Sequence, residues 1–577
     1  MPSRITLLVM VLAVLSAGCS APQSTSSGSI PNSQPGPIRI LVIAERFEVV
    51  YLSPKIQGSS SPINTTRLFN AALVMFDNVG APRPYVAEAL PQLNTSSWLV
   101  LPDGRMETTY TLRTALTWQD GTPLTAQDFA FALRVYKDSG LGVFLTAPQG
   151  TIDAIQTPDP RSVVVQWRSL NPDAGILSFG DLDPLPSQLM ESAFNDYEQG
   201  RASRETFLGN PAWSTEYVGA GPYRLSHWEP GAQLEGIAFD GHVLGRPKID
   251  RIVLRIIGDE NTVLAAVLAG GQVDYTEFFT LRVEHIPVLR REWEAAGKGA
   301  VAAGPSSAVA LHVQQRPDYV GDPGWLDLRV RRAIAHSLDR AALNEGLFNG
   351  IGFPTETIVS PTESIYPDVD RAMTKYPYDP NRAVQLMGEA GYTRDTEGQF
   401  VAPDGNRFRL DFSVTAGPEF ERGQAILSDS WRRTGFDVHP AILAAAQARD
   451  VQSRSTFPGL SSRGGGLAEV HFTAAEVGSP ANGWAGDNRS GWTNPNYERL
   501  WSAANATLDR AERARDSAQM LALVTENLPI YPLYFAIQVR TRVTGLQGPD
   551  DEALVTGFGL ASKGTTSHWN IYEWQFN

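Results

Sequence analysis

The chain has 577 residues, of which 42% are hydrophobic and 9% aromatic, a composition typical of packed globular domains and not of fibrous or disordered proteins. The length exceeds what one hydrophobic core supports, so we expect two or three domains. The 62 acidic residues outnumber the 48 basic ones, and the net charge of −14 argues against nucleic acid as a partner. A single cysteine rules out a disulfide within the chain.

The N-terminal segment has the layout of a cleavable export signal. Arg4 precedes an apolar run at residues 5–15 that is too short to span a bilayer. Small residues then lead to Cys19, and the string Leu15-Ser-Ala-Gly-Cys19 resembles the bacterial lipoprotein signal. We expect residues 1–19 to be this signal with Cys19 lipidated, a buried structural cysteine being the alternative. Residues 20–37 are rich in Ser, Gly and Pro and are expected to form a disordered tether.

The folded body is predicted to begin with a strand at Ile38–Ala44, a continuous apolar run after a proline. Thr125-Ala-Gln-Asp128 has the form of a capping box, and apolar residues then recur on one helical face as far as Tyr136. A strand at Arg251–Ile257 should lead into a helix that Asp259 or Asn261 caps.

Two further elements are well marked. Asp379-Pro380 supplies a helix cap and a first helical residue, an apolar stripe follows, and Gly391 ends the helix. Apolar and polar residues alternate over Phe408–Val414, which predicts a strand buried on one face. Because helices and strands interleave along the chain, we expect mixed α/β domains.

The common catalytic motifs are absent from the sequence. There is no G-x-S-x-G, no H-E-x-x-H, no phosphate-binding loop and no G-x-G-x-x-G. The eight histidines are scattered without the spacing of metal ligands, so neither a metal nor a cofactor is predicted. A pair of carboxylates that meet only in the fold remains open, and with it a secreted hydrolase.

A specific string runs from Leu116 to Phe129 and contains a D-G-T-P turn before a capped helix. Further strings lie at Pro84–Leu90, Tyr110–Arg113, Val218–Leu225, Leu268–Asp274, Asp327–Ala333, Asp379–Ala383, Asn494–Tyr497 and Leu528–Tyr534. In sequence and order these strings resemble one family, the large extracellular solute-binding proteins (family 5) of bacterial importers for oligopeptides, dipeptides, nickel and related ligands.

The resemblance implies a two-lobed periplasmic-binding-protein-like α/β fold (type II, large peptide-binding class) with a two-stranded hinge and an extra inserted domain. From the order of motifs we expect the N-terminal lobe to comprise residues 38–67, 211–304 and 535–577, the inserted domain residues 68–210, and the second lobe residues 305–534. Hinge closure around a ligand is the implied mode of action.

The resemblance also points to ligand-binding residues. Lys55-Ile-Gln-Gly-Ser59 resembles a K-I-x-G-x turn of oligopeptide binders, which makes Gln57 and Ser59 candidates, although a polar surface turn explains them equally well. Peptide binders often carry a tryptophan and then an aspartate for the peptide ammonium group, but this chain has Phe457–Gly466 there instead. Arg463 and Gly464 in that stretch favour an anionic ligand group, a flexible loop being the alternative. Trp484 is a candidate apolar wall and Tyr534 a candidate hinge or cleft residue.

The implied function is that of a substrate-binding lipoprotein, not an enzyme, which captures a peptide or another polar organic solute and delivers it to an ABC permease. The alternatives are a carboxylate-dependent hydrolase and, within the binding class, a metal-chelate binder. We expect an exported monomer, attached to the membrane only through its lipid on the outer face of the cytoplasmic membrane or in the periplasm.

Overall fold

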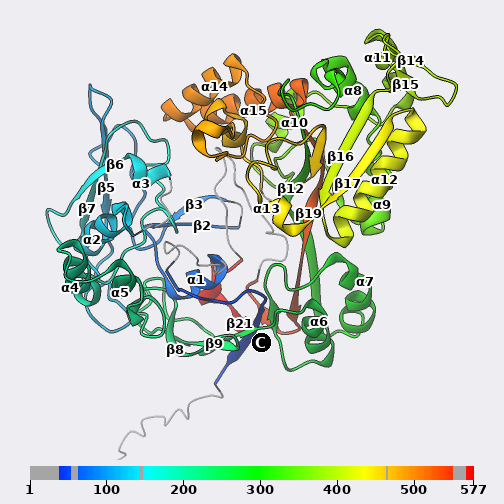
Figure 1. Ribbon diagram of the computed structural model, residues 1–577. Coiled ribbons are helices and arrows are strands. Elements are labelled where there is room, and N and C mark those ends of the chain that lie inside the picture. Colours follow the sequence, from blue (N-terminus) through cyan, green and yellow to red (C-terminus); the bar gives the residue numbers. More distant parts are fainter. Residues whose placement is uncertain (1–37, 54–62, 79, 142–146, 463–465, 550–566) are drawn as a thin grey trace, which may run out of the picture. The chain divides into compact units, whose positions relative to one another are not determined.

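The computed structural model describes residues 38–53, 63–78, 80–141, 147–462, 466–549 and 567–577 (Figure 1). The predicted lipidation site Cys19 and the tether at residues 20–37 lie outside the described residues. The chain from Arg39 to Asn577 forms one compact unit, built around one large mixed sheet and a separate four-stranded sheet.

The large sheet has two parallel regions joined by two long strands. In spatial order its strands are β17 (Asp437–Leu443), β16 (Arg409–Thr415), β18 (Leu460–Ser462), β12 (Gly299–Val313), β19 (Ile530–Val543), β11 (Tyr275–Thr276), β1 (Ile40–Glu45), β10 (Arg251–Ile256), β9 (Gln233–Ala238) and β8 (Tyr223–Glu229), and β13 (Phe353–Pro354) also pairs with β19. We call β1 and β8–β11 the first half-sheet, β16–β18 the second half-sheet, and β12 and β19 the crossover strands.

The crossover strands pair antiparallel along almost their whole length, and their pairing is interrupted near the middle. One stretch runs from Gly299, opposite Val543, to Pro305, and pairing resumes at Ala308, opposite Phe535. At the interruption the Ser306 hydroxyl donates to the carbonyl of Ala536 at 3.1 Å. Such an irregularity weakens the ladder locally and lets the two strands bend there.

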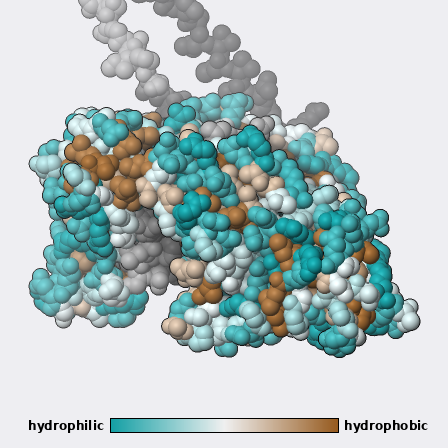
Figure 2. Space-filling model, turned by 90° about the horizontal axis from the view of Figure 1, so that it is seen from above, coloured by the Kyte–Doolittle hydropathy of each residue, from teal (hydrophilic) through white to brown (hydrophobic). Residues whose placement is uncertain are grey.

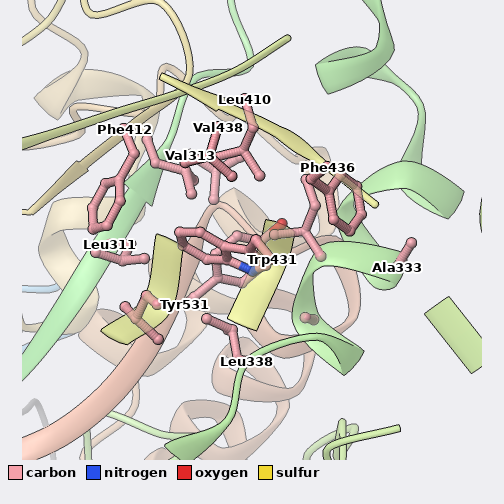
Figure 3. Close-up of a cluster of buried hydrophobic side chains, with 14 of the residues drawn as sticks. Leu311, Val313, Ala333, Leu338, Leu410, Phe412, Trp431, Phe436, Val438 and Tyr531 are labelled. Carbon is pink, nitrogen blue, oxygen red and sulfur yellow. The ribbon is translucent and has the colours of Figure 1, made fainter. Parts of the chain in front are cut away.

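Helices pack on the second half-sheet and enclose the largest core: α8 (Leu328–His336), α9 (Arg340–Phe348), α11 (Pro380–Glu389) and α12 (Pro418–Thr434). Smaller clusters hold α10 (Tyr366–Ala372), α14 (Pro495–Ala506) and α15 (Arg510–Asn527), and α13 (Ala445–Arg449) follows β17. Trp431 of α12 is fully buried and lies among side chains of the sheet, including Phe412 and Val438 (Figure 3). The rings of Trp431 and Phe412 meet edge to face, with centroids 5.3 Å apart.

The first half-sheet is packed by α1 (Ile63–Phe69), α6 (Glu260–Ala269) and α7 (Ile286–Leu289), and by the C-terminal segment. That segment returns to the first half-sheet, where β20 (Leu546–Gln547) pairs with β21 (Gln575–Phe576). Trp574 is fully buried against Tyr275 of β11, with ring centroids 5.1 Å apart.

A second body of structure lies between β1 and β8 in the sequence. Its sheet has the order β4 (Trp98–Val100), β5 (Met106–Thr111), β7 (Ser162–Trp167) and β6 (Ile152–Gln156). The helices α2 (Ala126–Lys137), α3 (Ala147–Thr151), α4 (Ser187–Glu198) and α5 (Arg204–Leu208) accompany it, and β2 (Val74–Phe76) pairs with β3 (Pro82–Pro84) nearby. This body has its own hydrophobic core, and we call it the four-stranded unit.

The locally predicted elements are confirmed. Asp379 caps α11, and the Asp128 carboxylate accepts the backbone N–H of Thr125 at 2.8 Å in the predicted capping box. Of the two possible caps of α6, Asp259 is the one used. The alternating segment forms β16, although Ser413 is also buried there, where its hydroxyl donates to the carbonyl of Leu460 in the neighbouring strand β18 at 3.2 Å.

Hydrophilic residues dominate the face shown in Figure 2, and the apolar residues gather in smaller separate areas. Among the described residues, no helix combines the length and the apolar character needed to cross a membrane.

Trp431→Ala should lower the free energy of unfolding by about 3–5 kcal/mol, because it empties a large volume in a fully packed core. Urea denaturation measures this. Val451→Ala is the control, since Val451 is 43% exposed and its truncation should change stability by less than about 0.5 kcal/mol. Equal losses in the two variants would contradict the packing described here.

Candidate functional site

The strand directions bring the carboxyl ends of the two half-sheets face to face. β1 is parallel to β11, and β11 is antiparallel to β19. Because β19 is itself antiparallel to β12, both β1 and β11 run in the same direction as β12, which is toward the second half-sheet. β18 is antiparallel to β12 and parallel to β16, so β16 and β18 run toward the first half-sheet. Ligands of α/β proteins bind at the carboxyl ends of parallel strands, and here two such edges point at each other.

Two buried glutamates mark the carboxyl ends of the first half-sheet. Glu45 ends β1, and its carboxylate accepts the backbone N–H groups of Arg46 at 2.8 Å and Phe47 at 3.2 Å. Thr65 of α1 donates to the other oxygen at 3.2 Å. Glu277 directly follows β11 and accepts a hydrogen bond from the Asn64 amide at 2.7 Å. These carboxylates therefore connect the strand ends to α1.

His568 of the C-terminal segment completes this cluster. Its Nε2 lies 2.7 Å from Glu277 Oε1, and its Nδ1 lies 3.2 Å from the backbone carbonyl of Asn64. Both ring nitrogens thus face oxygen atoms of the cluster. All these side chains are nearly inaccessible to solvent.

The two carboxyl groups titrate in opposite directions. Burial, reinforced by the negative charge of Glu277, raises the pKa of Glu45 to about 8. Burial alone would also raise the pKa of Glu277, but pairing with His568 and the hydrogen bond from Asn64 bring it below its ordinary value. At neutral pH Glu45 is therefore mostly neutral, beside the close contact of Glu277 with His568.

On the opposite side, the N-terminus of α12 lies at the carboxyl end of β16. Tyr534 of β19 donates to Glu419, in the first turn of that helix, at 2.8 Å. The Tyr534 ring packs edge to face on Phe348 with centroids 4.9 Å apart, and only 4% of the residue is exposed. Tyr534 thus lies in a crossover strand as expected, but its side chain belongs to the core of the second half-sheet.

Trp484 lies in a different place, beside a group of arginines. It is half-buried, its ring centroid is 6.1 Å from that of Tyr319, and its backbone has a φ of +64°. A left-handed conformation is uncommon for a bulky residue, and such conformations cluster at functional sites. The structure does not place Trp484 in the cluster that holds Tyr534. Trp492, the neighbouring tryptophan, is 6% exposed and packs on Tyr497 in a core.

The arginines near Trp484 share one carboxylate. Asp487 accepts hydrogen bonds from Arg454 at 2.7 Å and from Arg489 at 3.0 Å, and the Glu476 carboxylate accepts the backbone N–H of Asp487 at 3.0 Å. Burial and the charge of Arg454 lower the pKa of Arg489. Arg316 donates to the carbonyls of Gly478 and Arg489, which ties β12 to this region. No sequence pattern singled out these arginines, because only the fold brings them together.

The remaining predicted residues, Gln57, Ser59, Arg463 and Gly464, lie outside the described residues. Sequence reasoning missed Glu45, Glu277 and His568. Their cluster joins positions as much as 504 residues apart, and no local pattern could have revealed it. No group of three or more His, Cys, Asp or Glu side chains within the described ranges is arranged to hold a metal ion.

A family model described as bacterial extracellular solute-binding proteins, family 5 Middle, matches residues 88–469, more than half of the chain. The chain belongs to this family. An ABC transporter peptide-binding protein of Brucella ovis is similar, with 26% identity over 343 residues, 59% of this chain and 59% of that protein. The chain thus matches 59% of the length of the Brucella relatives.

Solved structures of similar proteins establish the fold. The oligopeptide-binding protein of Thermus thermophilus, in complex with a pentapeptide, has 22% identity and a TM-score of 0.68, covering 93% of this chain and 96% of that one. NikZ of Campylobacter jejuni, in complex with Ni(L-His), has 19% identity and a TM-score of 0.67, covering 93% and 100%. The predicted two-lobed α/β fold is confirmed, and we call the parts that contain the first and second half-sheets the first and second lobes.

The free energy of unfolding of the Glu45→Gln variant should increase relative to that of the unsubstituted protein as the pH rises from 5 to 8. The folded-state pKa of Glu45 is raised from 4.5 to about 8, so its contribution to stability is complete below pH 4.5 and is lost as the pH rises toward 8. Because glutamine does not ionise, the stability of the variant does not decrease in this way with pH. Urea denaturation at pH 5, 6, 7 and 8 measures the difference in free energy of unfolding, and a difference independent of pH would show that the carboxyl group is not desolvated.

Proposed function

We propose that this protein captures a small solute, a peptide or another polar organic molecule, between its two lobes and delivers it to an ABC permease without chemical change. The observation that carries the proposal is the pairing of the crossover strands, which points the carboxyl ends of two parallel half-sheets at each other. Family membership and the peptide- and chelate-binding proteins of the same fold support it.

The proposal includes the organisation inferred from the sequence. The N-terminal lobe is residues 38–67, 211–304 and 535–577, the inserted domain residues 68–210, and the second lobe residues 305–534. These limits fit the interruption of the crossover pairing between Pro305 and Ala308. Lipidation of Cys19 would tether an exported monomer to the membrane.

We further propose that the ligand carries an anionic group. In the sequence, Arg463 and Gly464 directly follow β18, which ends at Ser462. Two further arginines, Arg454 and Arg489, share the carboxylate of Asp487 in the same lobe. Gln57 and Ser59 stay candidates on the first-lobe side. A carboxylate on the ligand would satisfy these cations through charge-assisted hydrogen bonds.

A metal chelate is the second candidate, since NikZ of Campylobacter jejuni is solved with Ni(L-His). A chelate brings its own ligand atoms and needs no preformed group of metal-binding side chains. The hydrolase alternative differs from both because it releases products.

Thermal unfolding in the presence of three probes separates these functions: random pentapeptides, the same peptides with amidated C-termini, and Ni(II) with histidine. A ligand at a hundred times its Kd adds about 2.7 kcal/mol to the free energy of unfolding and raises Tm. We expect the free peptides to raise Tm more than the amidated ones, and mass spectrometry to recover them intact. Cleaved peptides would overturn capture, and a response to Ni(II)–histidine alone would favour the chelate.

Arg463→Ala should weaken binding of the free-carboxylate peptides about ten-fold or more, because it removes a hydrogen bond between charged groups. Titration calorimetry measures Kd. Arg371→Ala is the matched control, since the side chain of Arg371 is 75% exposed on α10 and its loss should leave Kd unchanged. An unaltered Kd in Arg463→Ala removes this residue from the site.

A further inference from the structure

A salt bridge joins the second lobe to the four-stranded unit. Nη1 of Arg513, in α15, lies 2.8 Å from Asp173 Oδ1, and Nη2 lies 3.5 Å from Oδ2. The two residues are 340 positions apart, and their side chains are only 9% and 18% exposed. Burial to this degree sets the pair apart from the many exposed ion pairs of the molecule, which contribute little to stability.

Neither partner is explained by its own local structure. Arg513 lies one turn after the Asp509 cap of α15, near the helix N-terminus, where the helix dipole disfavours a positive charge. Asp173 is held by a turn in which its N–H donates to the Asn171 side chain at 2.9 Å and its carbonyl accepts from Ile176 at 3.0 Å. The guanidinium group of Arg513 therefore meets the carboxylate of Asp173 although the two residues are 340 positions apart.

An apolar contact accompanies the ion pair. Leu508, in the turn between α14 and α15, packs against the hydrophobic core of the four-stranded unit. This core belongs to β4–β7 and α2, whereas Leu508 belongs to the second lobe. The α14–α15 turn thus docks on the four-stranded unit through an apolar residue and a buried salt bridge.

This contact is far from the crossover strands. Arg513 lies near the beginning of α15, and β19 begins just after its end, at Ile530. At 1.5 Å per residue the helix separates the salt bridge from the start of β19 by roughly 20 Å. A motion that bends the crossover strands therefore displaces the α14–α15 turn strongly and must break or form the contact.

We propose that Arg513, Asp173 and Leu508 form a latch that holds the second lobe against the four-stranded unit and so governs how readily the lobes separate. This inference rests on the proposed capture function, whose regulation it describes. In the separated state both charges are hydrated, and in the docked state they are paired. Removal of one partner removes the attraction that holds the docked state together, which shifts the population toward the separated state.

Small-angle scattering without any ligand tests the latch independently of ligand identity. Arg513→Gln and Asp173→Asn should each increase the radius of gyration, and the double variant Asp173→Arg with Arg513→Asp should return it toward that of the unsubstituted protein. Arg340→Gln is the control, because the side chain of Arg340 is 13% exposed and pairs with Glu356 within the second lobe. It should lower stability without changing the radius.

A chemical cross-link gives a second readout. The chain has one cysteine, at position 19, so Asp173→Cys with Arg513→Cys adds the only thiols of the folded body. This double variant lacks the ion pair and should itself increase the radius of gyration, and a short bis-maleimide that joins the two thiols should return the radius toward that of the unsubstituted protein. Equal radii for all variants would overturn the latch. If no probe raises Tm while the latch variants still expand the molecule, the capture proposal fails and the latch stands.

Discussion

The antiparallel pairing of β12 with β19 is the constraint on which the rest of the structure depends. Each strand runs from one half-sheet into the other, so their antiparallel pairing sets the directions of the neighbouring strands β11 and β18. Because the parallel strands of the two half-sheets run in opposite directions, their carboxyl ends meet. The same pair is interrupted between Pro305 and Ala308, and such an irregularity weakens the ladder locally.

The charged groups of the two lobes are arranged differently. At the carboxyl ends of β1 and β11, two buried carboxyl groups and a histidine lie close together, with Glu277 Oε1 2.7 Å from His568 Nε2. In the second lobe, Arg454 and Arg489 share Asp487, and the Glu476 carboxylate accepts the backbone N–H of Asp487 at 3.0 Å. The proposed anionic group of the ligand would pair with cations of this lobe.

The docking of α15 on the four-stranded unit gives this unit a mechanical role. In the proposed latch, the contact of Arg513 with Asp173, near the start of α15, limits how far the crossover strands let the second lobe move. The proposed capture then depends on a bend in the crossover strands and on the opening and closing of this contact.

The sequence by itself determined the family, the α/β class and the locally encoded elements, because caps, turns and alternating patterns are satisfied within a few residues. Asp379 caps α11, Asp128 closes the capping box of α2, and the alternating residues after Phe408 form β16. The inferred domain limits and most of the candidate ligand residues stay predictions. Only the tertiary structure decided that Tyr534 turns into a core, that His568 reaches Glu277, and that Arg513 meets Asp173. These contacts join residues hundreds of positions apart, and their partners are selected by strand register and helix packing, which no short stretch of sequence contains.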